Sequence, residues 1–335
     1  KQLPMIGSQV ASPGEPDTFT KLRFSACGRF FAAGNWDGQL RTYRLEDDHA
    51  QYASWHSVGK NEPVLDVTWS TDSRRVYAGV ADGSVQVIDP EVDIKIPLGQ
   101  HQAAVASVAN LGENIVTCSW DQTLRVWDPR IQGNVAFTRL ASRAHAMCVG
   151  DFKGDPSALV VTAGEPYSLT SMISCVDFRA LGLSVAVEPS KLTYPVRCIA
   201  AFPPVADGTG FAYGGVEGRV HIAYMRGPAP FSFKCHRQDK NVFSVNDITY
   251  SNTTGAIATV GGDGTLCFWD QASKRRLSMK RGDSPLLCCQ FSPCGRYLGF
   301  ASGEDWSQNE RRRGLTEGLF LYTLQPGDVA VGKGK

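Results

Sequence analysis

The chain has 335 residues, of which 42% are hydrophobic and 20% are charged. Its 34 basic and 33 acidic side chains leave a formal net charge of +1, which argues against dedicated nucleic-acid binding and against attachment to an anionic membrane surface. This apolar content is enough for a folded core, whereas the apolar runs are far shorter than the roughly 20 residues of a membrane-spanning helix.

The start of the chain and its cysteines indicate a reducing compartment. Residues 1–10 lack the cationic start, apolar middle and cleavage site of a secretory signal, which favours the cytosol or nucleus. The ten cysteines are spread singly except for Cys288 and Cys289, and most lie in apolar runs where a reduced thiol packs as a small hydrophobe. Cys235 and His236 would point to opposite faces of a strand. We therefore expect no disulfide, metal site or cofactor.

A unit of about 40 residues recurs along the chain. Each copy has an apolar strand, a polar turn, a second strand ending in Ala or Gly, an Asp-Gly or similar turn, and a third strand. The distance from Asp121 to Glu217 is two periods, so a degenerate copy is expected over residues 146–179. The other six copies are Lys21–Arg44, Val64–Pro90, Ala104–Arg130, Val196–Tyr224, Val245–Asp270 and Leu286–Thr323.

These units predict an all-β fold. Asp-Gly dipeptides supply the positive φ angles of tight hairpin turns, so each unit should form a small antiparallel sheet. One such sheet cannot bury both of its faces, whereas sheets packed radially cover one another. We predict a single seven-bladed β-propeller over residues 1–335, closed by pairing of residues 5–10 with the last unit. A double β-sandwich is the alternative that the spacing disfavours.

Two polar segments near the end of the chain fall outside the repeat. Residues 304–318 are expected to form a long loop within the last blade, and residues 327–335 a flexible tail. Trp306, Arg311, Arg312 and Arg313 lie in the loop and suggest contact with a partner or with RNA, in which arginine neutralises phosphate and tryptophan stacks on a base. A solvated loop is the alternative.

Several strings resemble a known family. The Trp-Asp endings at residues 127–128 and 269–270 resemble WD repeats over nearly the whole chain. The strings EGRV at residues 217–220 and FSFKCHR at residues 231–237 are more specific. They resemble the messenger-RNA export factors of the Gle/Rae type, which are nuclear-pore propellers, and the related mitotic-checkpoint propellers of the Bub type. Residues 305–307 are more similar to the export factors.

The resemblance implies a non-enzymatic adaptor in mRNA export at the nuclear pore complex, located in the nucleus and nuclear envelope and able to shuttle to the cytoplasm. Both families bind a hairpin-forming peptide, the GLEBS motif, on one propeller face, and for export factors this peptide belongs to a phenylalanine-glycine-repeat nucleoporin. The matching residues are Trp36, Arg219 and Arg237, with Lys234 and His236 as flanking residues. Guanidinium groups can hold peptide carboxylates in bidentate pairs, and a tryptophan supplies an apolar anchor.

Other interpretations of these residues stay open. An arginine on a propeller strand is usually solvated or part of a weak ion pair. Trp36 could pack between blades, although its place before the turn favours the surface. His56, His101 and His145 are expected to hydrogen-bond within a blade.

Three classes of function remain. The chain is a messenger-RNA export adaptor, a mitotic spindle-checkpoint adaptor that binds GLEBS-like segments of checkpoint kinases, or an enzyme or substrate receptor on a propeller scaffold. The sequence has no nucleophile elbow, phosphate loop or HExxH string, which disfavours an enzyme. Neither a small-molecule substrate nor membrane insertion is expected.

Overall fold

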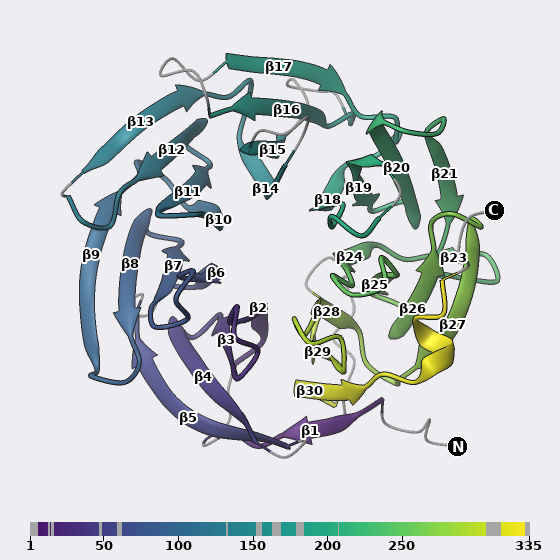
Figure 1. The fold of residues 1–335 in the computed structure, drawn as a ribbon, viewed down its shortest axis with the longest axis horizontal. Coiled ribbons are helices and arrows are strands. Elements are labelled where there is room, and N and C mark those ends of the chain that lie inside the picture. Colours follow the sequence, from purple (N-terminus) through teal and green to yellow (C-terminus); the bar gives the residue numbers. More distant parts are fainter. Residues whose placement is uncertain are drawn as a thin grey trace.

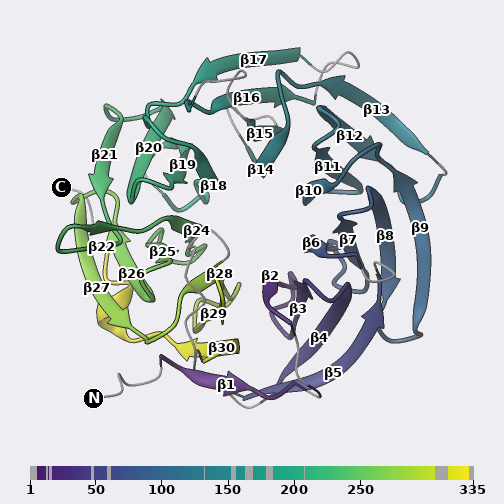
Figure 2. The same cartoon turned by 180° about the vertical axis from the view of Figure 1, so that it is seen from behind.

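The computed structural model describes residues 6–12, 14, 17–46, 49–58, 62–131, 133–151, 156–162, 169–178, 184–206, 208–305 and 316–331. Within these residues the chain forms seven four-stranded antiparallel sheets and one two-stranded ribbon. Figures 1 and 2 show the sheets arranged radially around a ring, with one edge strand of each sheet near the centre. This confirms the predicted all-β propeller and excludes the double sandwich.

The first three sheets in chain order are β2 (Phe19–Phe24), β3 (Phe30–Asn35), β4 (Gln39–Glu46) and β5 (His49–Ser57); β6 (Val64–Trp69), β7 (Val76–Val80), β8 (Ser84–Asp89) and β9 (Ile94–Gln100); and β10 (Val105–Leu111), β11 (Asn114–Ser119), β12 (Thr123–Trp127) and β13 (Asn134–Arg139). The next two are β14 (Ala144–Asp151), β15 (Pro156–Thr162), β16 (Met172–Asp177) and β17 (Ser184–Pro189); and β18 (Val196–Ala201), β19 (Thr209–Gly215), β20 (Arg219–Arg226) and β21 (Phe231–Lys234).

The ribbon of β22 (Arg237–Gln238) and β23 (Asn241–Val242) precedes the sheet of β24 (Val245–Tyr250), β25 (Ile257–Gly261), β26 (Thr265–Asp270) and β27 (Arg275–Arg281). The remaining sheet joins β28 (Leu286–Phe291), β29 (Tyr297–Ser302) and β30 (Gly318–Thr323) to β1 (Ser8–Val10). The degenerate copy therefore forms a sheet, β14–β17. No helix in the described part of the chain has the length and apolar character needed to cross a membrane.

The two ends of the chain meet in one sheet. β1 pairs antiparallel with β30, and Val10 lies opposite Leu319 in the register. Val10 is buried in the same apolar cluster as Leu319 and Phe19, the first residue of β2. The predicted closure of the ring by the N-terminal segment is confirmed for residues 8–10, whereas Met5 lies outside the described residues.

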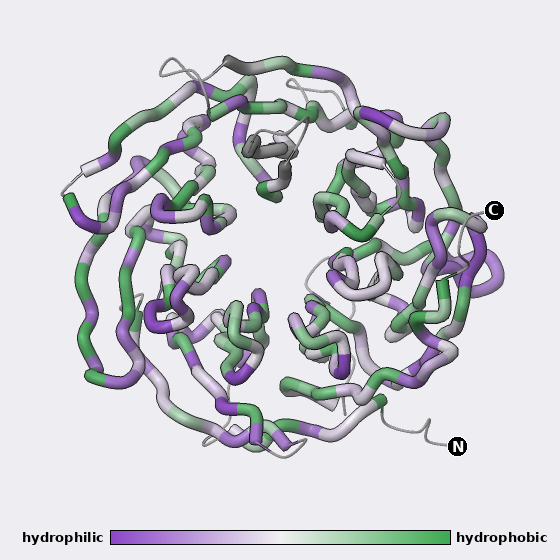
Figure 3. Tube along the Cα trace, viewed as in Figure 1, coloured by the Kyte–Doolittle hydropathy of each residue, from purple (hydrophilic) through white to green (hydrophobic). Residues whose placement is uncertain are grey.

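Apolar contacts hold neighbouring sheets together, and Figure 3 shows hydrophobic residues distributed around the whole ring. The innermost strand of one sheet packs against the second strand of the sheet before it. A Cβ atom on Gly34 would lie 2.7 Å from Cγ1 of Val64, and one on Gly79 would lie 2.6 Å from Cγ1 of Val105. This close approach explains why the second strand of the repeat carries Ala and Gly.

The Asp-Gly turns differ from the expectation in one respect. Positive φ angles occur at Gly38 (78°) and Gly83 (89°), whereas the preceding aspartates are not in the left-handed region. The aspartates act through their side chains instead. Asp37 Oδ1 accepts a hydrogen bond from the backbone of Gln39 at 2.9 Å, and Asp82 Oδ1 accepts one from Ser84 at 2.8 Å. The carboxylate thus stabilises the turn as a local side-chain acceptor.

A short turn follows β30 near the end of the described residues. Residues 326–328 form a 3-10 turn, and Asp328 is buried. Its carboxylate accepts hydrogen bonds from the hydroxyls of Ser278 and Tyr322 and lies 3.3 Å from Lys280 Nζ. Asp328 is thus held against β27 and β30, and the flexibility of residues 327–331 stays a prediction. Residues 332–335 lie outside the described residues.

A buried polar network links the strands of the β10–β13 sheet. His101 Nδ1 lies 2.9 Å from Asp121 Oδ2, and its Nε2 lies 2.7 Å from Thr117 Oγ1. The indole of Trp127 donates to the same threonine oxygen at 2.8 Å. His101 is 2% exposed, so this network confirms its predicted structural role.

We predict that Thr117→Val lowers the free energy of unfolding by about 2 kcal/mol, because the buried indole N–H of Trp127 loses its acceptor. Urea unfolding of the purified protein measures this change. Thr68→Val on the inner strand β6 is the matched control and should change stability by less than about 0.5 kcal/mol. Equal losses for the two variants would contradict the role of the network.

Asp121 makes the free energy of unfolding depend on pH in the acidic range. Burial alone would raise its pKa, but hydrogen bonds from Thr123, Gln102 and His101 outweigh burial and lower the pKa to about 2. An unfolded aspartate has a pKa near 3.9, so the folded state binds fewer protons between these values. The stabilisation is present above about pH 4 and is lost as the pH falls toward about 2.

We therefore expect Asp121→Asn to lower stability at pH 7 by about 2 kcal/mol, and to flatten the stability curve between about pH 4 and pH 2. Urea unfolding across this range measures both effects. A variant curve parallel to that of the wild type would contradict the assignment.

Candidate functional site

Equivalent loops gather on one face of the ring. In several sheets the first residue after the second strand donates its backbone N–H to a carbonyl just before the innermost strand. These pairs are Trp36 to Thr18, Ala81 to Pro63, Trp120 to Ala104, Val216 to Pro195, Gly262 to Ser244 and Gly303 to Pro285. The repeated bond places all six loops on the same face, which we call the loop face.

A cavity of about 290 Å³ opens at the centre of the loop face. Trp36 and Trp120 line it from equivalent loops and are 43% and 44% exposed. His145 on β14 and Arg197 on β18 line it from other sheets. The predicted surface position of Trp36 is confirmed. Trp120 was missed as a site residue, although both tryptophans directly precede the turn aspartate.

A polar network forms part of the cavity wall. Arg197 Nη1 donates to Asn246 Oδ1 at 2.8 Å and to Ser244 Oγ at 3.0 Å, and lies 3.5 Å from Asp305 Oδ1. The Asp305 side chain is 1% exposed and accepts a hydrogen bond from Asn246 Nδ2 at 3.0 Å. These contacts hold the Arg197 guanidinium in a fixed position in the cavity wall. Arg197 was not predicted as a site residue, because the residues around it carry no distinctive motif.

Three predicted residues meet at another part of the loop face. Arg219 begins β20 and lies opposite Lys234 of β21 in the register. Arg237 Nη2 donates to the carbonyl of Glu217 at 2.8 Å, and its Nε donates to the carbonyl of Gly218 at 3.4 Å. We call Arg219, Lys234 and Arg237 the basic cluster. Lys234 and Arg237 are exposed and Arg219 is partly exposed, so the cluster presents positive charge to solvent.

Glu217 is the local counter-ion of the basic cluster. Its Oε2 lies 3.5 Å from Arg219 Nε, and its Oε1 accepts a hydrogen bond from the backbone of Thr193 at 2.9 Å. The Arg219 side chain is 37% exposed, so this ion pair is weak and leaves the guanidinium accessible to another carboxylate.

The predicted site is divided between two places. The lining of the central cavity includes Trp36 but none of the basic cluster. The tryptophan and the arginines share the loop face through their equivalent loops, so a ligand must extend across that face to contact both.

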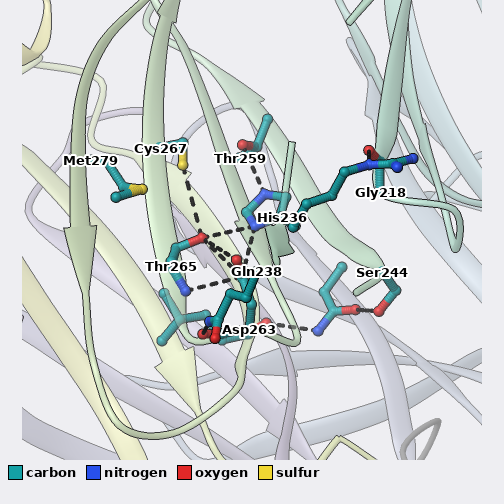
Figure 4. Close-up of polar contacts among 12 residues, drawn as sticks. Gly218, His236, Gln238, Ser244, Thr259, Asp263, Thr265, Cys267 and Met279 are labelled. Carbon is teal, nitrogen blue, oxygen red and sulfur yellow. Dashed lines mark hydrogen bonds and ion pairs between the residues drawn. The ribbon is translucent and has the colours of Figure 1, made fainter. Parts of the chain in front are cut away.

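His236 does not belong to the accessible site. It is 3% exposed, with Nδ1 at 2.8 Å from Asp263 Oδ1 and Nε2 at 3.0 Å from Thr259 Oγ1. Trp269 Nε1 donates to the same threonine, which repeats the network around His101. Figure 4 shows His236 enclosed by Thr259, Asp263 and Thr265. The expected assistance from His236 is therefore wrong, because both ring nitrogens are used inside the sheet.

The remaining residues singled out from the sequence lie in several different environments. Cys235 and His236 follow β21 instead of lying within a strand, and the described residues hold no group of three His, Cys, Asp or Glu side chains arranged for a metal. His145 lines the central cavity, and its predicted hydrogen bonding within a blade stays a prediction. His56 contacts a neighbouring sheet as well as its own strand. Trp306, Arg311, Arg312 and Arg313 lie outside the described residues.

Comparisons with known proteins agree with the propeller fold and with the resemblance to mRNA export factors. The family model described as "WD domain, G-beta repeat" matches residues 54–89, 94–128 and 229–270. The chain is 32% identical to "Protein Rae1" of Drosophila melanogaster over 90% of its length and 88% of that protein. It is also 32% identical to "Poly(A)+ RNA export protein" of Schizosaccharomyces pombe, covering 90% of this chain and 85% of that protein.

A plant relative and a solved structure extend the comparison. The chain is 30% identical to "Protein RAE1" of Arabidopsis thaliana, over 96% of this chain and 92% of that protein. The structure titled "Structure of U3-55K" superposes with a TM-score of 0.80 at 13% identity, covering 97% of this chain and 100% of that one. At that identity the likeness establishes the fold alone.

Proposed function

We propose a function for this chain from one premise: it belongs to the family of Rae1-type mRNA export factors. Relatives named as export factors match it over most of their length, and we assign this chain a role in mRNA export. A WD-repeat propeller serves such a role as a binding scaffold, because its loops can present side chains from several sheets on one surface.

The side chains on the loop face indicate what kind of ligand the chain binds. The basic cluster offers two guanidinium groups and one ammonium group within adjoining strands. Arg237 is already oriented by two backbone carbonyls, so less side-chain entropy is lost when a carboxylate binds. Trp36 and Trp120 offer broad apolar surfaces at the cavity. This combination fits a peptide that carries both acidic and apolar residues.

We infer that the peptide is a GLEBS-type hairpin of a phenylalanine-glycine-repeat nucleoporin, and that the chain acts at the nuclear pore complex. Acidic residues of the hairpin pair with Arg219 and Arg237, and Lys234 adds positive charge beside them. The central tryptophans bury an apolar residue of the same peptide. No step in this activity requires catalysis, a cofactor or a small-molecule substrate.

RNA contact by Trp306, Arg311, Arg312 and Arg313 is a separate part of the proposal. With a net charge of +1 on the whole chain, such contact depends on this short segment and must be weak and sensitive to salt.

Arg219→Ala combined with Arg237→Ala should weaken binding of a GLEBS-type nucleoporin peptide about 30-fold or more, because two charge-assisted pairs are lost. Calorimetry measures the dissociation constant. Arg226→Ala, an exposed arginine at the opposite end of β20, is the matched control and should bind as the wild type does. Circular dichroism checks that each variant folds.

Three outcomes of this experiment would count against the proposal. Binding that is indifferent to both arginines would mean that the site lies elsewhere. Equal loss in the Arg226 control would indicate a general charge effect. Failure of the wild type to bind the nucleoporin peptide, with binding of a checkpoint-kinase segment, would favour the mitotic-checkpoint adaptor.

Trp36→Ala and Trp120→Ala should each weaken the same peptide about tenfold, because each removes an apolar contact surface. The salt dependence of binding should stay close to that of the wild type, whereas the double arginine variant should lose most of it. Trp55→Ala is the matched control, since Trp55 is 55% exposed but lies on β5 outside the cavity lining. Calorimetry at several salt concentrations separates the apolar contribution of the tryptophans from the ionic contribution of the arginines. If the tryptophan variants lost as much salt dependence as the double arginine variant, this assignment would be contradicted.

A further inference from the structure

A serine, a histidine and an aspartate are linked between the first two sheets. Ser54 and His56 alternate on β5, so both side chains point to the same side of the strand. His56 Nε2 lies 3.1 Å from Ser54 Oγ, and His56 Nδ1 lies 2.8 Å from Asp93 Oδ1. Asp93 belongs to the turn between β8 and β9, so the three residues bridge two sheets.

The hydrogen bonds have a consistent direction. The Asp93 carboxylate accepts the proton on His56 Nδ1, which leaves Nε2 as an acceptor for the Ser54 hydroxyl. Thr42 Oγ1 lies 2.7 Å from Ser54 Oγ and can donate to it, which completes the chain. The His56 side chain is 5% exposed, so the ring is held in this orientation. A serine hydroxyl directed at an oriented imidazole is the arrangement of an activated nucleophile.

The position of Asp93 depends on its backbone. Asp93 has a φ of +51°, in the left-handed region that residues other than glycine seldom occupy. A second link holds the same two sheets in place, because Lys95 Nζ donates to the carbonyl of Ser57 at 2.9 Å. Asp93 itself is exposed, so its role is to orient the imidazole and not to provide a buried charge.

Ser54 borders a small cavity of about 100 Å³. Phe30 and Trp69 give this cavity an apolar wall, and Arg74 and Glu91 add one basic and one acidic side chain. The register of β4 and β5 shifts at this point and leaves Ala53 without a partner opposite it, in the same cavity wall. Arg74 is the basic residue of this lining and the side chain that can stabilise negative charge on an attacked carbonyl oxygen. The volume suits a short acyl group.

We propose that Ser54 is a nucleophile that accepts short acyl groups from esters, with His56 as general base and Asp93 as a positioning residue. Ser54 Oγ attacks the ester carbonyl while His56 Nε2 takes the hydroxyl proton. The C–O bond to the alcohol breaks, and the alcohol leaves with that proton. Water attacks the acyl-serine through the same base, releasing the carboxylic acid and restoring the hydroxyl. This activity is independent of peptide binding on the loop face.

A fluorophosphonate probe tests the nucleophile directly, since it phosphonylates activated serines. In the full chain, mass spectrometry should locate the adduct on Ser54, formed at least about tenfold faster than on Ser57. Ser57 is the matched control because it is an exposed serine on the same strand. Ser54→Ala should abolish the adduct and the hydrolysis of p-nitrophenyl acetate, whereas Ser57→Ala should retain both.

The positioning role has its own test. Asp93→Asn should slow labelling about tenfold or more, because an amide can donate to Nδ1 and place the proton on Nε2. Asp93→Glu keeps a carboxylate and should restore most of the rate, which a purely structural effect on folding would not explain. A folded wild type that gives no Ser54 adduct, or labelling unchanged by His56→Gln, would overturn the proposal.

Discussion

The pairing of β1 with β30 is the contact on which the rest of the structure depends. A radial array buries each sheet between two neighbours only if its first and last members also meet. Three residues of the N-terminal strand complete the last sheet and bring Val10 against Leu319 and Phe19. Because each inner strand packs on the sheet before it, closure also fixes where the loops of every sheet stand. The loop face therefore exists only in the closed ring.

Buried polar networks then set the local shape of that face. His101 with Asp121, and His236 with Asp263, tie a turn aspartate to the core of its sheet. Burial of a carboxylate is costly unless its hydrogen bonds are satisfied, and here they are. Trp120 precedes one of these aspartates, and Arg237 follows one of these histidines. The same buried groups that stabilise the sheets thus position exposed side chains on the loop face.

The sequence allowed the architecture to be predicted because the repeat and its turn residues are local signals. Arg219 and Arg237 were singled out together through the family resemblance, and the structure joins Arg237 to the carbonyls of the two residues before Arg219. Trp120 and Arg197 were missed, because their importance comes from the central cavity that distant sheets build together. The same reason applies to Asp93, which lies 37 positions from His56 and shares no pattern with it. Asp328 was missed because its partners lie on β27 and β30.

The near-neutral charge of the chain suits a divided binding face. A large positive field would attract any polyanion, including RNA and membrane surfaces, and would not distinguish among acidic peptides. Here the basic cluster lies at one part of the loop face, while Trp36 and Trp120 lie in a cavity whose lining excludes that cluster. A ligand gains from both regions only if its acidic and apolar residues have the matching separation. Under the proposed function, selectivity comes from the spacing of the two regions across the ring, which packing of the sheets holds constant.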